Sequence, residues 1–263
     1  MWKNLRVEYE PEHLRNPLLL ISLSTSNPQF MLLYSQAREL ANYLLDKLEF
    51  KRFASFYTSA MPPAVSISED GIAEMVGVHF YHYSLENRDI VLLAGYSSPS
   101  SNEYEFVEEI LQFASKNLGV RELVSIGARW NEEPIPPLES PKVLGFGTDQ
   151  EAVKHLENNG VTILRGEPAY YFANTVVGLA PRYGIRGYKL SVNHGEPKPH
   201  PRSLMAFLDT LSRAFGIHVD ATDLESQAKE LANAIKSSQF EQREGIRQRA
   251  MGPTTEQQGD IYR

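Results

Sequence analysis

The chain contains no cysteine among its 263 residues. This absence excludes disulfide bonds, thiolate zinc sites and cysteine nucleophiles. Long apolar runs are missing as well. The longest early one covers only residues 18–21, and it follows the charged residues Glu10, Glu12 and Arg15. A membrane helix needs about 20 apolar residues, and a signal peptide needs a longer apolar segment behind a basic start. We therefore expect no membrane segment, no signal peptide and a cytoplasmic protein.

Basic residues are fewer than acidic residues in this chain. The 26 Lys and Arg residues are outnumbered by 33 Asp and Glu residues, which gives a net charge of −7 at pH 7. A general nucleic-acid binder neutralises phosphates with a face rich in lysine and arginine. The balance of charge therefore predicts that nucleic acid is not a partner.

Several motifs of catalysis and cofactor binding are also absent. The sequence has no Walker pattern and no Gly-x-Ser-x-Gly elbow, so it lacks the usual phosphate loop and the usual hydrolase nucleophile. Gly145 and Gly147 do not make a dinucleotide loop, since the later glycine of that motif is missing. We expect no cofactor, no metal and no catalytic residue.

Apolar periodicity is plentiful, and it alternates between strands and helices. Apolar runs predict strands at residues 17–24, 53–58, 74–83, 88–95, 123–127, 143–147, 161–164 and 188–192. Amphipathic stripes predict helices that begin at Pro28, Asn102, Thr148, Asn174, Pro201 and Thr222, with Asn102, Thr148 and Thr222 as N-terminal caps. This rhythm indicates an α/β fold, with a mostly parallel sheet between two helical layers.

The apolar stripe ends near residue 236. We expect an α/β domain at 1–236 and a polar, solvated extension at 237–263, with helix continuing as far as Ala250 at most. Residues 252–260 of this extension have no apolar period. The last three residues of the sequence are Ile261, Tyr262 and Arg263. This hydrophobic-Tyr-X ending is typical of a peptide that binds in a pocket of a partner protein.

Histidines are the natural candidates for a metal or acid–base site. His79 and His82 are three apart on a predicted strand, so their side chains point to opposite faces and favour core or surface roles. His194, Glu196 and His200 share one loop, and together they could bind zinc or act as acid and base. The three prolines among them favour a rigid turn before a helix instead.

Carboxylates and aromatic residues supply the remaining candidates. Glu132 and Glu133 are adjacent acids in a proline-rich loop, where such pairs are usually solvated. Residues 80–83 and the pair Tyr170 and Tyr171 are an aromatic surplus. We expect half of these rings to pack in the core and the others to form a subunit interface.

Several segments together form a recognisable pattern: residues 143–148, Gly166, residues 184–187, 201–203 and 215–220. With these segments, the body of the chain resembles the proteasome-assembly-chaperone family, in particular its archaeal homo-oligomeric members. The order of elements from Pro17 onward fits that family, and two features differ: Pro168, Tyr170 and Tyr171 follow Gly166 in place of a glycine-rich turn, and His200 stands where the family tends to have aspartate.

The resemblance implies a nucleoside-phosphorylase-like fold without the catalytic residues of that fold. It further implies a non-enzymatic homo-oligomer that works as a proteasome assembly chaperone or as an ATP-independent activator. Ile261, Tyr262 and Arg263 would insert into pockets between α-subunits of the 20S proteasome. A paralogous chaperone is a further possible partner.

A function of another class stays open. The chain could be a small-molecule enzyme of the phosphorylase or hydrolase type. Its site would lie at the carboxyl ends of the parallel strands, near residues 97–102 and 127–130. Convergent polar side chains and a perturbed histidine or carboxylate would favour this alternative, whereas a filled or apolar cleft would exclude it.

Overall fold

The computed structural model describes residues 5–9, 13–24, 36–61, 64–130, 141–194 and 200–250. Its strands are β1 (Leu5–Tyr9), β2 (Leu18–Ser22), β3 (Lys51–Thr58), β4 (Val65–Ile67), β5 (Ala73–Met75), β6 (Val78–Ser84), β7 (Asp89–Gly95), β8 (Glu122–Trp130), β9 (Val143–Gly147), β10 (Thr162–Ile163) and β11 (Arg186–His194). The helices are α1 (Gln36–Lys47), α2 (Glu103–Lys116), α3 (Gln150–Asn158), α4 (Phe172–Leu179), the 3-10 turn η1 (Ala180–Tyr183), α5 (Pro201–Phe215) and α6 (Thr222–Ala250).

One large sheet organises the described part of the chain. Its nine strands lie in the order β1-β3-β6-β7-β2-β8-β11-β9-β10. The four central strands, β7, β2, β8 and β11, are all parallel to one another. The strands on the β1 side pair antiparallel, and β9 pairs antiparallel with β11. The α/β class is confirmed, with the parallel pairing concentrated at the centre of a mixed sheet.

Helices cover both faces of this sheet. One core contains the inner faces of α1, α3 and α5 together with the start of α6. The other core lies under α2 and α4 and includes Phe56, Phe80 and Phe113, whose rings contact one another. Strands buried on both faces need apolar residues at successive positions, which is why residues 18–21 and 90–93 are fully apolar and no more than 1% exposed.

The helix caps differ from the prediction at three positions. Asn102 precedes α2 but has a left-handed backbone and makes no side-chain cap bond. Asp149, not Thr148, caps α3 by accepting from the Ala152 N–H. The Thr148 hydroxyl instead accepts from the Gly187 N–H in β11.

The N-terminal cap of the final helix and the first residue of α4 also differ from the prediction. At α6, Asp220 accepts hydrogen bonds from the N–H and the hydroxyl of Thr222, so the predicted capping box is replaced by an aspartate two residues earlier. The helix predicted from Asn174 begins at Phe172, two residues earlier.

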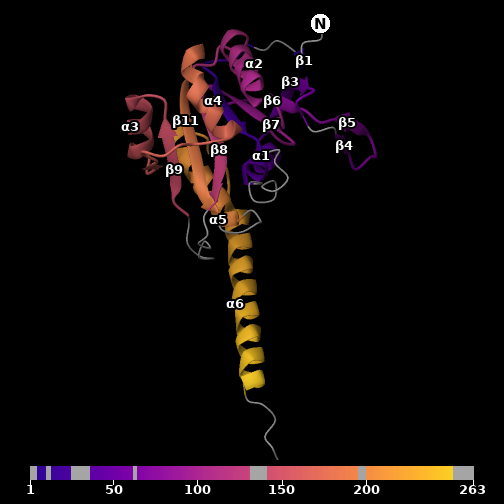
Figure 1. The fold of residues 1–263 in the computed structure, drawn as a ribbon, viewed down its shortest axis with the longest axis vertical. Helices are drawn as coiled ribbons and strands as arrows, with labels where there is room; N and C mark the ends of the chain where they lie inside the picture. The colour runs from indigo at the N-terminus through magenta and orange to yellow at the C-terminus, as the bar shows by residue number, and fades with distance from the viewer. Residues whose placement is uncertain are drawn as a thin grey trace, which may run out of the picture.

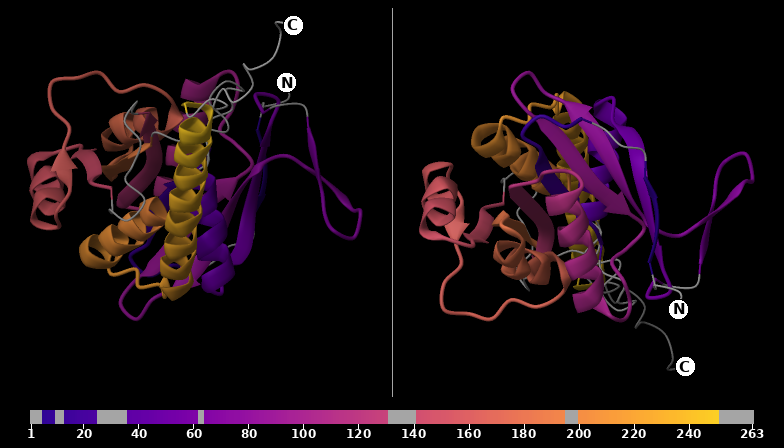
Figure 2. Two further views of the ribbon diagram at one scale, coloured as in Figure 1. Left: turned by 90° about the horizontal axis from the view of Figure 1, so that it is seen from below. Right: turned by 90° about the horizontal axis from the view of Figure 1, so that it is seen from above.

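Two elements stand away from the body. The hairpin of β4 and β5 projects to one side (Figures 1 and 2) and exposes Val65, Ile67, Ile72 and Met75. Helix α6 packs its first turns on α5 through Leu224, Ala228 and Ala232, and then leaves the body as a single rod (Figure 1). It crosses the predicted boundary at 236/237 without a break. The division into 1–236 and 237–263 itself stays a prediction.

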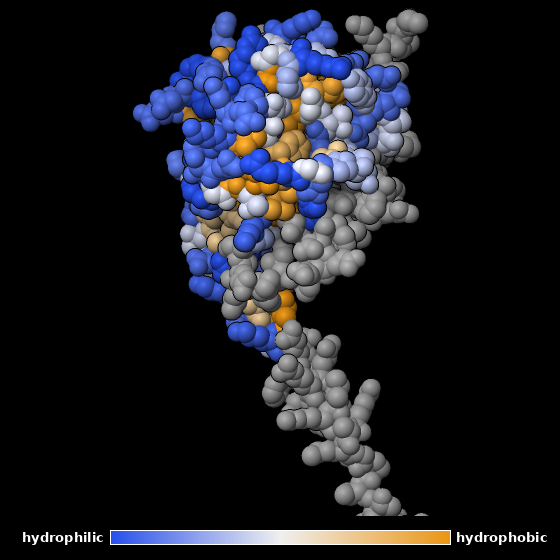
Figure 3. Space-filling model, turned by 60° about the vertical axis from the view of Figure 1, so that its left-hand side comes forward, coloured by the Kyte–Doolittle hydropathy of each residue, from blue (hydrophilic) through white to orange (hydrophobic). Residues whose placement is uncertain are grey.

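Apolar and hydrophilic residues are unevenly distributed over the surface. On the face turned forward in Figure 3, apolar residues gather in a band bordered by hydrophilic ones. No helix in the described residues is both long enough and apolar enough to cross a membrane.

Candidate functional site

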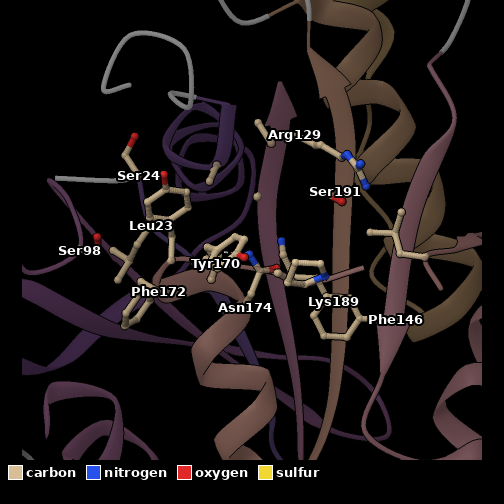
Figure 4. A pocket seen from close by; sticks show the side chains of 18 of the residues that line it. Leu23, Ser24, Ser98, Arg129, Phe146, Tyr170, Phe172, Asn174, Lys189 and Ser191 are labelled. Atoms are coloured by element: carbon tan, nitrogen blue, oxygen red, sulfur yellow. Dashed lines mark hydrogen bonds between the residues drawn. The ribbon is translucent and has the colours of Figure 1, made fainter. Parts of the chain in front are cut away.

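A cavity of about 550 Å³ lies at the carboxyl ends of the parallel strands. Leu23 and Ser24 follow β2, Ser98 follows β7, Arg129 belongs to β8 and Ser191 to β11, and all five line it (Figure 4). Parallel strands end at the same edge of a sheet, so residues far apart in sequence meet there. The volume is in the range of small-molecule pockets.

The start of α4 forms one wall of the cavity. Phe172, Ala173 and Asn174 line it from the first turn of the helix. Tyr171 before them has a φ of 71° and a ψ of 164°, a positive-φ backbone that is uncommon for a residue with a side chain. Its carbonyl accepts from the N–H groups of Asn174 and Thr175, and this turn places both Tyr170 and Tyr171 at the cavity.

The loops after β2 and β7 are joined on the opposite side. The Ser98 N–H donates to the Ser24 carbonyl at 2.7 Å. The Ser22 hydroxyl donates to the Ala37 carbonyl at 2.6 Å, which holds the beginning of α1 against β2. These bonds hold together the wall of the cavity that Ser24, Ala37 and Ser98 line.

Lys189 is the most unusual lining residue. It belongs to β11, is 3% exposed, and its Nζ donates to the carbonyls of Leu190 at 2.8 Å and Ser125 at 3.4 Å. Both acceptors are neutral, and Lys189 makes no salt bridge with any described residue. Burial without a counter-ion disfavours the ammonium form and lowers the pKa of Lys189 to about 7.

The cavity has its own ion pair at the rim. Arg129 makes two hydrogen bonds of 2.8 Å to the carboxylate of Glu167. The bond from Arg129 lowers the pKa of Glu167 and raises that of Arg129. This pair ties β8 to the segment before α4 and neutralises the charge of both partners.

His79 and His82 contact different side chains, so they do not form a shared site. His79 Nδ1 lies 2.9 Å from the Ser55 hydroxyl, whereas His82 Nε2 lies 3.2 Å from the Ser84 hydroxyl and 3.5 Å from Asp89. Within the described ranges, no three His, Asp or Glu side chains are grouped to hold a metal.

His200 is 2% exposed and caps α5, where its Nδ1 accepts from the Arg202 N–H at 3.1 Å. The side chain of His194, the residue Glu196 and the pair Glu132 and Glu133 lie outside the described residues. At its one described position the loop supplies a capping histidine, and the zinc alternative stays untested.

The aromatic residues divide between core and surface. Phe80 is fully buried, and Tyr81 and Tyr83 are partly buried. Tyr170 and Tyr171 are 65% and 53% exposed and border the cavity. Their role in a subunit interface stays a prediction.

Ile261, Tyr262 and Arg263 also lie outside the described residues. Their role in docking stays a prediction as well.

The cavity lies where the enzyme alternative places its site, but its chemistry is different. Its described lining contains no histidine, and the carboxylate in it, Glu167, is paired with Arg129. The perturbed group is Lys189, which the sequence analysis did not single out. The sequence signal for it is a lysine inside the strand predicted at residues 188–192, and strand alternation also allows such a side chain to face solvent.

Fold and cavity together define a three-layer α/β protein with a mixed nine-stranded sheet, counted over the described residues, and a long C-terminal helix. The model of the PAC2 family matches residues 37–239, and the chain belongs to this family. No curated protein is significantly similar to it in sequence.

Solved structures show the same fold at low sequence identity. PbaB of Pyrococcus furiosus, described as an archaeal proteasome activator, has a TM-score of 0.76 at 19% identity and covers 90% of this chain and 100% of its own. PbaA of the same organism, described as an archaeal homolog of proteasome-assembly chaperone, gives 0.68 at 19%, covering 97% and 100%.

A proteasome-assembly chaperone homologue of Mycobacterium tuberculosis gives a TM-score of 0.67 at 17% identity, covering 84% of this chain and 94% of its own. None of these three descriptions names an enzyme.

Proposed function

We propose that this chain is a proteasome-binding assembly chaperone or ATP-independent activator. It docks Ile261, Tyr262 and Arg263 into pockets between neighbouring α-subunits of the 20S proteasome. Membership of the PAC2 family and the likeness in fold to PbaB support this function. The observation that carries the proposal is α6, the last described element, which leaves the body and places Ala250 far from it (Figure 1).

Helix α6 has the length of a spacer. Its 29 residues correspond to about 43 Å at a rise of 1.5 Å per residue, of which the turns as far as Ala232 pack against the body. Residues 251–260 could add at most about 33–36 Å if fully extended. A tail on such a support reaches a ring-shaped partner while the α/β body stays clear of the surface of the ring.

The ending has the chemistry of an anchor. Full enclosure of the Ile261 and Tyr262 side chains would stabilise a complex by about 1.5–3 kcal/mol each. The tyrosine hydroxyl needs a hydrogen-bond partner when buried, and the terminal carboxylate would bind a basic residue in the pocket. The Arg263 side chain has no necessary role in this arrangement.

One tail of this kind binds weakly, because ordering a flexible segment opposes binding. A homo-oligomer that presents several tails on one face raises the effective concentration of each after the first has docked. The hairpin of β4 and β5 supports self-association. Four of its large apolar residues are 54–67% exposed: Val65, Ile67, Ile72 and Met75.

The direct test is native mass measurement of the protein alone and mixed with 20S proteasomes. We expect wild-type protein to co-migrate with the 20S particle, and deletion of residues 261–263 or Tyr262→Ala to abolish co-migration while the oligomer persists. Arg263→Ala is the matched control, and it should still bind. Undiminished co-migration of the truncated protein would refute docking by the tail.

A second assay separates the two modes of action. An activator increases hydrolysis of a fluorogenic peptide by preassembled 20S particles without ATP. A chaperone instead accelerates formation of 20S particles from free subunits. Failure of wild-type protein in both assays, despite co-migration, would exclude both roles and leave a binding protein of another kind.

A further inference from the structure

The described lining of the cavity over β8 and β11 contains no residue of α6, and the proposed docking does not use this cavity. It combines two features that neither core packing nor strand pairing requires. One is an internal volume of about 550 Å³, and the other is a lysine amine enclosed at its floor without a counter-ion. Burying an unpaired ammonium is strongly unfavourable, so a lysine at this position calls for an explanation.

The geometry leaves one position on the amine unused. Beyond Cε, a tetrahedral Nζ has three positions, and two of them are directed at the carbonyls of Ser125 and Leu190. A Cβ at Gly127 would come within 2.7 Å of Nζ, so the glycine provides the space that the amine occupies. Gly127 itself lines the cavity. In the neutral form, the unused position is the nitrogen lone pair.

The surroundings favour that neutral form. The other titratable side chains that line the cavity are Arg129, Glu167, Tyr170 and Tyr171. Arg129 and Glu167 neutralise each other, and the elements β2, β9, α1 and α4 contribute no titratable side chain to the described lining. Desolvation therefore acts on Lys189 without opposition and lowers its pKa to about 7. A desolvated lysine of this kind is a nucleophile near neutral pH.

The remaining walls suit an apolar ligand. Phe146 of β9 and Tyr170 add aromatic rings to the lining, with Phe146 near Lys189 in Figure 4. Phe172 of α4 lies toward the aliphatic side chain of Leu23 on the other side of the view (Figure 4). The hydroxyl of Ser191 lies two residues along β11 on the same face, because alternate residues of a strand share a face. A small molecule with an aromatic or aliphatic body and one polar group matches this lining.

We propose that this cavity binds a small aldehyde or ketone with an apolar body and holds it as a reversible imine on Lys189 Nζ. The lone pair of Nζ attacks the carbonyl carbon and forms the C–N bond, while the π electrons move to the carbonyl oxygen. The two protons of the amine pass to that oxygen, the electron pair left on nitrogen forms the C=N double bond as the C–O bond breaks, and water leaves. No electron is gained or lost overall, and hydrolysis returns the amine and the carbonyl compound.

The test uses benzaldehyde as the probe and sodium borohydride to reduce any imine to a stable benzyl amine. The full-length protein is treated at pH 7.4, digested, and analysed by mass spectrometry. A lysine with the reference pKa of about 10.4 is about one-thousandth neutral at this pH, whereas Lys189 is mostly neutral. We expect Lys189 to be benzylated at least about tenfold faster than the exposed Lys154 of α3 in the same sample.

Three variants sharpen the result. Lys189→Met should abolish the fast adduct, and Lys154→Met should leave it unchanged. Gly127→Ala places a methyl group against Nζ without removing the amine, so it should slow benzylation of Lys189 several-fold even if Lys189→Met does not fold. Deletion of residues 261–263 should have no effect on the adduct, which separates this site from docking to the proteasome.

The dependence on pH provides an independent readout. The rate of benzylation of Lys189 should reach half its plateau near pH 7, whereas an ordinary lysine continues to gain reactivity up to about pH 10. The proposal is overturned if Lys189 reacts no faster than Lys154, or if benzaldehyde raises the melting temperature without forming an adduct at Lys189.

Discussion

Replacing Lys189 by methionine should change the way in which stability depends on pH. Methionine keeps most of the length of the side chain and removes the amine. In the folded protein the pKa of Lys189 is about 7, compared with the ordinary lysine value of 10.5. Between these two values the unfolded chain binds a proton that the folded chain does not. The free energy of unfolding of the wild type therefore rises with pH across this window.

The magnitude follows from the two pKa values. Stability changes by about 1.4 kcal/mol per pH unit inside the window and levels off below the folded pKa. From pH 7 to pH 9 the wild type should therefore gain about 2 kcal/mol relative to Lys189→Met. From pH 5 to pH 7 the difference should change by less than about 0.5 kcal/mol, because both folded and unfolded chains are then largely protonated.

Urea denaturation at pH 5, 7, 8 and 9, followed by circular dichroism, measures this difference. Lys154→Met is the matched control, since Lys154 is exposed on α3. The difference between the control and the wild type should stay constant over the same range. Parallel stability curves for the wild type and Lys189→Met would refute a buried, counter-ion-free amine.

Two further substitutions test the packing of the sheet. Asp89→Asn should destabilise the fold by about 1.5–3 kcal/mol at pH 7, because the Asp89 side chain is 2% exposed and accepts from the backbone N–H and guanidinium of Arg15. Gly145→Ala should destabilise by about 1–3 kcal/mol, since its Cβ would come within 2.3 Å of the Lys189 carbonyl oxygen. Thermal unfolding measures both.

The destabilisation caused by Asp89→Asn should itself depend on pH. Burial alone would raise the pKa of Asp89, but the hydrogen bonds from Arg15 outweigh it and the pKa is lowered. The contribution of the carboxylate is therefore complete above its unfolded pKa, near 4, and is lost as the pH falls through the folded value. A deficit for Asp89→Asn that persists undiminished at pH 2 would contradict this account. For Gly145→Ala, an unchanged melting temperature would show that β9 can move away from β11.

Most of the fold could be predicted from the sequence, because apolar runs and stripes report burial directly. The central strands around residues 18–22, 90–94 and 123–127 lie as predicted, and so do the inner faces of α2 and α5. The caps were predicted less well. Thr148 and Asp149 are adjacent and both can cap, but the Thr148 hydroxyl accepts from the Gly187 N–H of β11 and Asp149 caps the helix.

The position of the candidate site could be predicted from the sequence, but the chemistry of its lining residues could not. Strand order puts the residues after β2, β7 and β8 at one edge of the sheet, so a cavity near residues 97–102 and 127–130 could be expected. Lys189 could not be identified, because strand alternation allows a lysine to face solvent. Its burial depends on the pairing of β11 with both β8 and β9 and on the cover that α4 provides, which no local pattern contains.

The contact of α6 with α5 has a consequence at long range. Leu224, Ala228 and Ala232 lie in the first turns of a helix whose far end is about 43 Å from its start. A small rotation at this base becomes a large sideways displacement at Ala250, as with any lever held at one end. Substitutions at these three positions should therefore redirect the end of the chain without touching it. In the proposed oligomer, the spread of the tails would thus be governed from inside the α/β core.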